Sequence, residues 1–172
     1  MLNDDSLLLV IDMQEGFRFP ESEKIIENIQ FVASFFDNVI FTKFVDYQGS
    51  LFDKQLHWNT FQDKEKQKIM SEFLTLNFKL FDHNTYNPIT EEVRLFIKNN
   101  NFNKIFIVGV YTDVSILLSA MLLFDMGIET FVVGDACNSV HKNQINNLHA
   151  SSLESLSHIL GKDHVIETGF FK

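Results

Sequence analysis

The chain has 172 residues, a length that suits one domain around a single hydrophobic core, so we expect one domain over residues 1–172. Its net charge of −9 argues against binding to nucleic acid or to an anionic membrane, because both are polyanions. A single cysteine, Cys137, excludes an internal disulfide framework, and the acidic amino terminus argues against a signal peptide. We therefore expect a cytoplasmic protein.

Apolar runs rich in β-branched residues predict six strands, with helical periodicity between most of them. The predicted strands are residues 6–11, 38–44, 75–80, 105–108, 129–133 and 164–166. The predicted helices are residues 22–36, 64–73, 90–99, 114–126 and 142–160, and the fourth of these is apolar enough to be buried. Residues 46–63 are polar and aperiodic, and we interpret them as a long excursion over the active-site end.

This alternation predicts a three-layer, Rossmann-like α/β/α sandwich with a six-stranded, mainly parallel sheet. The strand order 3-2-1-4-5-6 would place the carboxyl ends of the first and fourth strands side by side, where ligands bind in such sheets. Asp12 follows the first strand and Ser115 lies in the first helical turn after the fourth. The predicted order therefore brings these two residues together.

Three polar residues in this framework are candidates for chemistry, and each also has a purely structural interpretation. Asp12 could accept a proton from a nucleophile or could only cap a turn. Lys79, inside the apolar run LNFKLF, could steady negative charge or could extend its ammonium group to solvent. Ser115 could be a nucleophile at a helix start or a small packing residue.

The segment GVYTDVSILLSA, residues 109–120, resembles the signature of the isochorismatase-like cysteine hydrolases, except that Ser115 occupies the position of the nucleophilic cysteine. DMQEGF, residues 12–17, resembles the Asp-x-Gln-x-x-Phe motif of the same family. TYN at 85–87 and VVGDACNS at 132–139 resemble two further family segments, so the similarity covers nearly the whole chain.

The resemblance implies a triad of Asp12, Lys79 and the nucleophile position, here Ser115, from the ends of strands one, three and four. It also implies a cis peptide between Val110 and Tyr111, with the backbone N–H groups of Tyr111 and Ser115 forming an oxyanion hole. Loop residues are expected to line the substrate pocket: Gln14, Phe17, Trp58, Tyr86 and Tyr111.

These observations predict a hydrolase of a small molecule, most simply of its C–N (amide) bond, with Ser115 either natural or an engineered replacement of cysteine. The alternatives are an inactive pseudoenzyme that binds a small ligand or a protein partner, and a cysteine-independent hydrolase of the isochorismatase type. A Ser-His-Asp triad would need a histidine aimed at Ser115, for which His83 and His149 are candidates.

Neither a cofactor nor a metal is expected. The glycine-rich nucleotide motifs are missing from the sequence, and so is the Asp-x-His pair that the nicotinamidase branch places after strand two. The resemblance implies a homo-oligomer, since the family usually assembles. The nineteen phenylalanines point the same way, because so many are hard to bury in one small domain.

Overall fold

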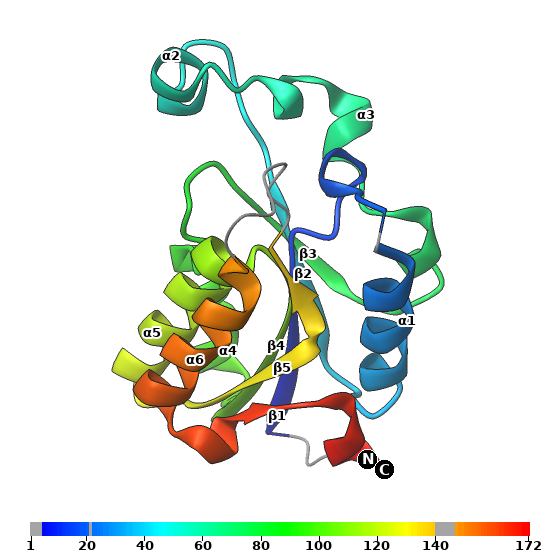
Figure 1. Ribbon diagram of the computed structural model, residues 1–172, viewed down its shortest axis with the longest axis vertical. Coiled ribbons are helices and arrows are strands. Elements are labelled where there is room, and N and C mark those ends of the chain that lie inside the picture. The colour runs from blue at the N-terminus through cyan, green and yellow to red at the C-terminus, as the bar shows by residue number, and fades with distance from the viewer. Residues whose placement is uncertain (1–4, 21, 140–146) are drawn as a thin grey trace.

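A computed structural model describes residues 5–20, 22–139 and 147–172, and its core is one six-stranded sheet of order β3-β2-β1-β4-β5-β6. Every neighbouring pair of strands in this sheet is parallel, so the predicted fold class and strand order are confirmed (Figure 1). The strands are β1 (Ser6–Ile11), β2 (Val39–Phe44), β3 (Lys79–His83), β4 (Lys104–Val110), β5 (Glu129–Asn138) and β6 (Val165–Ile166).

Helices cover both faces of the sheet (Figure 1). Helix α1 (Ser22–Ala33) packs on one face, and α4 (Glu91–Asn99), α5 (Leu117–Asp125) and α6 (Leu148–Leu160) pack on the other. Two short helices, α2 (Leu51–Leu56) and α3 (Lys64–Gln67), lie beyond the carboxyl ends of the strands, and α2 projects from the body. The first residues of the helix predicted at 142–160 fall outside the described residues.

Strand β1 separates two hydrophobic cores because its side chains alternate between the faces of the sheet. Leu8 and Val10 belong to the core under α1, whereas Leu7, Leu9 and Ile11 belong to the core under α4, α5 and α6. All five side chains are fully buried. The unbroken apolar sequence of β1 is therefore explained by burial on both faces.

Most of the phenylalanines are inside the molecule. Phe124 and Phe170 are the two that are more than half exposed, at 53% and 56%. Phe124 and Met121 lie on α5, so the expected full burial of that helix is wrong for its outer face. Phenylalanine content therefore gives little support to the expected homo-oligomer, which stays a prediction.

The third strand begins later than the sequence suggests. We expect residues 75–80 from the apolar run, but β3 starts at Lys79 and ends at His83, which pairs with Phe44 of β2. β3 is an edge strand, and its Leu80 is 40% exposed. An edge strand is not required to be apolar on both faces, so its sequence pattern is weak.

The excursion after β2 has more regular structure than its sequence indicates. Ser50 caps the start of helix α2, and its hydroxyl accepts a hydrogen bond from the backbone N–H of Asp53 at 3.0 Å. The helix ends at His57, which adopts a left-handed backbone conformation with φ 52°. No helix within the described ranges is long and apolar enough to cross a membrane.

Candidate active site

Three neighbouring strands contribute to a buried polar cluster at the carboxyl end of the sheet. Asp12 directly follows β1, Thr42 lies on β2, and His83 is the last residue of β3. The Oδ1 atom of Asp12 accepts hydrogen bonds from the Thr42 hydroxyl and from Nε2 of His83, both at 2.8 Å. The side chains of Asp12 and His83 are 3% and 2% exposed, so their interaction is shielded from water.

The partners of His83 indicate that its ring is doubly protonated. Nε2 faces the Asp12 carboxylate, and Nδ1 lies 2.8 Å from the backbone carbonyl oxygen of Thr85. Both partners are acceptors only, so each ring nitrogen has to carry a proton to make its bond. Burial alone lowers the pKa of His83, but the charge and hydrogen bond of Asp12 and the Thr85 carbonyl outweigh it and raise the pKa. The cluster is therefore a buried carboxylate–imidazolium pair.

Lys79 does not belong to this cluster, so its predicted position at the end of the third strand is wrong. It is the first residue of β3, at the opposite end of the strand from His83. Its ammonium nitrogen lies 4.6 Å from the ring centroid of Phe96 and 5.1 Å from that of Phe81, on the outside of the sheet. The cation beside Asp12 is therefore His83, four residues further along the chain.

The end of β4 lies beside the end of β1 because Ile11 pairs with Gly109. Gly109 has φ +117°, and a Cβ atom there would lie 2.1 Å from the carbonyl oxygen of Ile11, so only glycine fits. The peptide bond between Val110 and Tyr111 is cis, as the family resemblance implies.

Ser115 lies in a single π-helical turn, Thr112–Ile116, that follows β4 and leads into α5. The turn is defined by a bond from the backbone N–H of Ile116 to the carbonyl oxygen of Tyr111 at 3.0 Å. Ser115 is 7% exposed, and it shares the carboxyl edge of the sheet with Asp12 through the pairing of β1 and β4. Single π-helical turns of this kind are frequent at functional sites.

His149 occupies a different place from His83. Its Nδ1 lies 2.8 Å from the hydroxyl oxygen of Thr112, so Thr112 connects the π-helical turn to α6. Partial burial lowers the pKa of His149, which favours the neutral ring. Within the described ranges, no group of three His, Cys, Asp or Glu side chains is arranged to hold a metal ion.

The aromatic residues expected to line the pocket form one continuous cluster. The Phe17 ring lies 5.3 Å from Tyr111 and 6.0 Å from Trp58, centroid to centroid. Phe52 connects Tyr86 to this cluster, because the Phe52 ring centroid lies 4.9 Å from that of Tyr86 and 5.8 Å from that of Trp58. These contacts bring the predicted residues together, whereas their role in binding substrate stays a prediction.

Gln14 has a structural role that the sequence does not reveal. Its amide nitrogen donates to the carbonyl oxygens of Phe44 and Gln67, both at 2.9 Å, and its amide oxygen accepts from the backbone N–H of Phe44 at 2.8 Å. The side chain is fully buried. With both ends of the amide engaged, Gln14 ties the end of β2 to the last residue of α3 and is not free to bind substrate.

Sequence reasoning missed Thr42 and misjudged His83. Thr42 is a polar residue inside the apolar strand VIFTKF, and that position is the one signal that could have suggested a buried partner. The sequence suggests His83 only as a base for Ser115, yet its two nitrogens bond to Asp12 and Thr85. An imidazolium that donates a hydrogen bond from each ring nitrogen has no lone pair with which to accept the serine proton.

Comparisons with known proteins agree with this architecture. A family model described as an isochorismatase domain matches residues 6–162. A search of curated protein sequences finds no match to this chain.

Solved structures share the fold at low sequence identity. An isochorismatase-like hydrolase from Alkaliphilus metalliredigens has a TM-score of 0.83 and 15% identity, with 96% of each chain covered. A nicotinamidase pyrazinamidase from Acinetobacter baumanii has a TM-score of 0.83 and 16% identity, with 100% of each chain covered. An N-carbamoylsarcosine amidase from Thermoplasma acidophilum has a TM-score of 0.80 and 14% identity, covering 95% of this chain and 96% of that one.

Proposed function

Because this chain belongs to the isochorismatase family, we propose that it is a hydrolase that cleaves the C–N bond of small amides. The observation that carries the proposal is the buried Asp12–His83 pair at the carboxyl edge of the sheet, the edge that Ser115 shares. A desolvated carboxylate held in one orientation is suited to proton transfer. The amide bond is favoured because two structures with this fold are named as amidases, a nicotinamidase and an N-carbamoylsarcosine amidase.

Asp12 is the proposed general base. Its Oδ1 atom accepts the bonds from Thr42 and His83, which hold the carboxylate in place, and we assign Oδ2 to the reaction. The Ser115 hydroxyl oxygen bonds to the amide carbon while its proton passes to Asp12. Asp12 then protonates the leaving nitrogen, the C–N bond breaks, and a water molecule hydrolyses the resulting ester.

His83 supplies a fixed positive charge in place of the lysine that the family resemblance implies. The charge stabilises the negative charge that develops on the substrate. It does not ionise Ser115, because the pKa of a hydroxyl lies far above that of a thiol. We therefore expect slow turnover compared with a cysteine at the same position.

The experiment measures ammonia release from a panel of small primary amides. The unmodified chain should release ammonia slowly, Ser115→Cys should be faster, and Asp12→Asn and Ser115→Ala should each lower kcat by at least about 100-fold. Lys79→Gln is the matched control, because Lys79 lies at the other end of β3, and it should leave the rate unchanged.

Three results would change the proposal. Activity that survives Ser115→Ala but not Asp12→Asn would mean that Asp12 activates water directly, as in a cysteine-independent hydrolase. No ammonia release by either the unmodified chain or Ser115→Cys would favour a pseudoenzyme that only binds its ligand. A large loss in Lys79→Gln would return the catalytic cation to Lys79 and contradict the role given to His83.

A further inference from the structure

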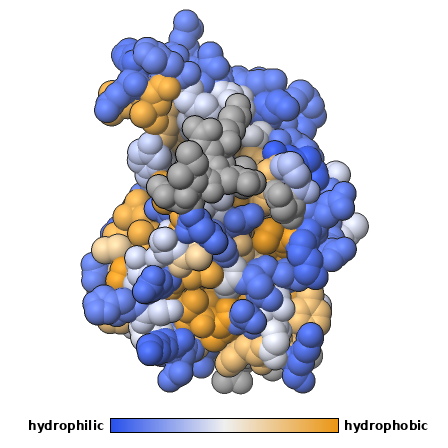
Figure 2. Space-filling view, in the orientation of Figure 1, coloured by the Kyte–Doolittle hydropathy of each residue, from blue (hydrophilic) through white to orange (hydrophobic). Residues whose placement is uncertain are grey.

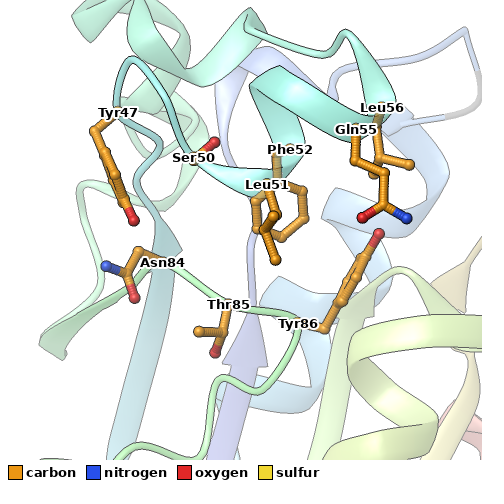
Figure 3. A pocket seen from close by; sticks show the side chains of 9 residues that line it. All are labelled: Tyr47, Ser50, Leu51, Phe52, Gln55, Leu56, Asn84, Thr85 and Tyr86. Carbon is orange, nitrogen blue, oxygen red and sulfur yellow. The ribbon is translucent and has the colours of Figure 1, made fainter.

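A cavity of about 330 Å³ lies between α2 and the loop that follows β3, apart from Asp12 and Ser115 (Figure 3). Leu51 and Phe52 point down from α2, and Tyr86 points up from the loop toward Gln55 (Figure 3). The volume falls at the lower end of the range for small-molecule sites, roughly 300–1,000 Å³. The lining residues are Tyr47, Ser50, Leu51, Phe52, Gln55, Leu56, Asn84, Thr85 and Tyr86.

The lining is apolar with a few neutral polar groups and contains no charged side chain. Leu51 is 72% exposed, Leu56 51% and Tyr86 50%, which leaves much apolar surface around one hollow. In the space-filling view, hydrophobic side chains of the projecting α2 lie next to hydrophilic ones at the top of the molecule (Figure 2). Of the two charged residues of α2, Asp53 is engaged with the backbone N–H of Gly49. An uncharged, mainly apolar group therefore suits this cavity better than an ion.

The cavity shares two residues with the surroundings of the Asp12–His83 pair. The carbonyl oxygen of Thr85, a lining residue, is the partner of Nδ1 of His83. Phe52, also a lining residue, packs against Phe44 at 4.9 Å, and Phe44 in turn packs edge-on against the His83 ring at 5.6 Å. A ligand in the cavity would thus lie next to residues that hold the catalytic cation.

We propose that this cavity binds an uncharged aliphatic or aromatic substituent of the substrate, remote from the bond that is cleaved. This inference rests on the proposed amide hydrolysis, and it narrows the substrate class to amides whose acyl part ends in an apolar group. The neutral side chains of Asn84 and Gln55 offer hydrogen bonds for one or two polar atoms on that group.

The test compares four defined probes: acetamide, hexanamide, 4-phenylbutanamide and adipamate, which matches hexanamide in length but ends in a carboxylate. Dissociation constants from ligand-observed NMR are measured alongside kcat/KM, so that binding is known even without turnover. Each buried methylene tightens binding about fourfold, so hexanamide and 4-phenylbutanamide should bind at least about tenfold more tightly than acetamide. Adipamate should lose this gain.

Variants of the cavity residues test whether the tighter binding of the long amides arises at this cavity. The double variant Leu51→Asn with Leu56→Asn should remove most of the difference between the long amides and acetamide, and because both side chains are largely exposed it should fold normally. Leu95→Asn is the control, because Leu95 is also an exposed leucine (48%) but lies on α4, outside the cavity lining, and it should keep the difference.

Binding that is independent of acyl length would overturn the inference. So would a gain that survives the double variant, or adipamate bound as tightly as hexanamide. If the long amides bind at the cavity and lose affinity in the double variant but no amide is cleaved, the ligand class stands and the proposed hydrolysis fails.

Discussion

Replacing His83 by glutamine tests whether the Asp12–His83 pair is charged. Glutamine can still reach the carboxylate, but it leaves Asp12, whose side chain is 3% exposed, without a counter-charge. Removing one partner of a buried ion pair costs about 3–5 kcal/mol, and we expect about 3 kcal/mol here because the glutamine amide still donates one hydrogen bond. The double variant Asp12→Asn with His83→Gln removes both charges, and should be at least about 1 kcal/mol more stable than His83→Gln alone.

The pH dependence of this difference follows from the direction of the pKa shift. The pKa of His83 is raised in the folded protein, since the charge of Asp12 and its hydrogen bond outweigh the lowering by burial. Its stabilising contribution is therefore complete below the unfolded pKa, about 6.5, and is lost as the pH rises through the folded value. The stability gap between the unmodified chain and His83→Gln should shrink as the pH increases above neutrality.

Urea denaturation followed by Trp58 fluorescence measures both effects, because Trp58 stacks on Phe44 at 5.6 Å beside this site. A cost below about 1 kcal/mol for His83→Gln would refute the charged pair, as would a gap that grows with pH. NMR titration of the His83 ring gives an independent measurement of its protonation.

Three further outcomes follow from other contacts. Gly109→Ala should cost at least about 3 kcal/mol in urea denaturation, because its Cβ would meet a β1 carbonyl oxygen at 2.1 Å, and a near-neutral result would contradict that packing. Gln14→Leu should cost about 2–4 kcal/mol, because it leaves the N–H and carbonyl of Phe44 unpaired, and a loss below about 1 kcal/mol would show that water replaces the amide. In Ser115→Cys the new thiol should react with iodoacetamide at pH 7 much faster than Cys137, whose pKa is raised by full burial, and equal rates would mean that the site does not activate a thiol.

The sequence by itself determined the central part of the fold. β1 and β4 are buried on both faces, so after their first residues, Ser6 and Lys104, they consist of apolar residues and one glycine. Asp12 marks the end of β1, and Gly109 lies one residue before the end of β4. Parallel order then places those ends at one edge, and this was enough to bring Asp12 and Ser115 to the same edge of the sheet.

Only the tertiary structure decided which cation accompanies Asp12 and what Gln14 does. β3 is an edge strand with one open side, so its pattern is too weak to show that the strand ends at His83 rather than Leu80. The bond between Asp12 and His83 joins residues 71 apart in the chain, and the bonds of Gln14 reach 30 and 53 residues away. Local hydrophobic periodicity indicates which residues are buried. The charge of the His83 ring and the hydrogen bonds of the Gln14 amide instead depend on which distant groups face them in the folded sheet.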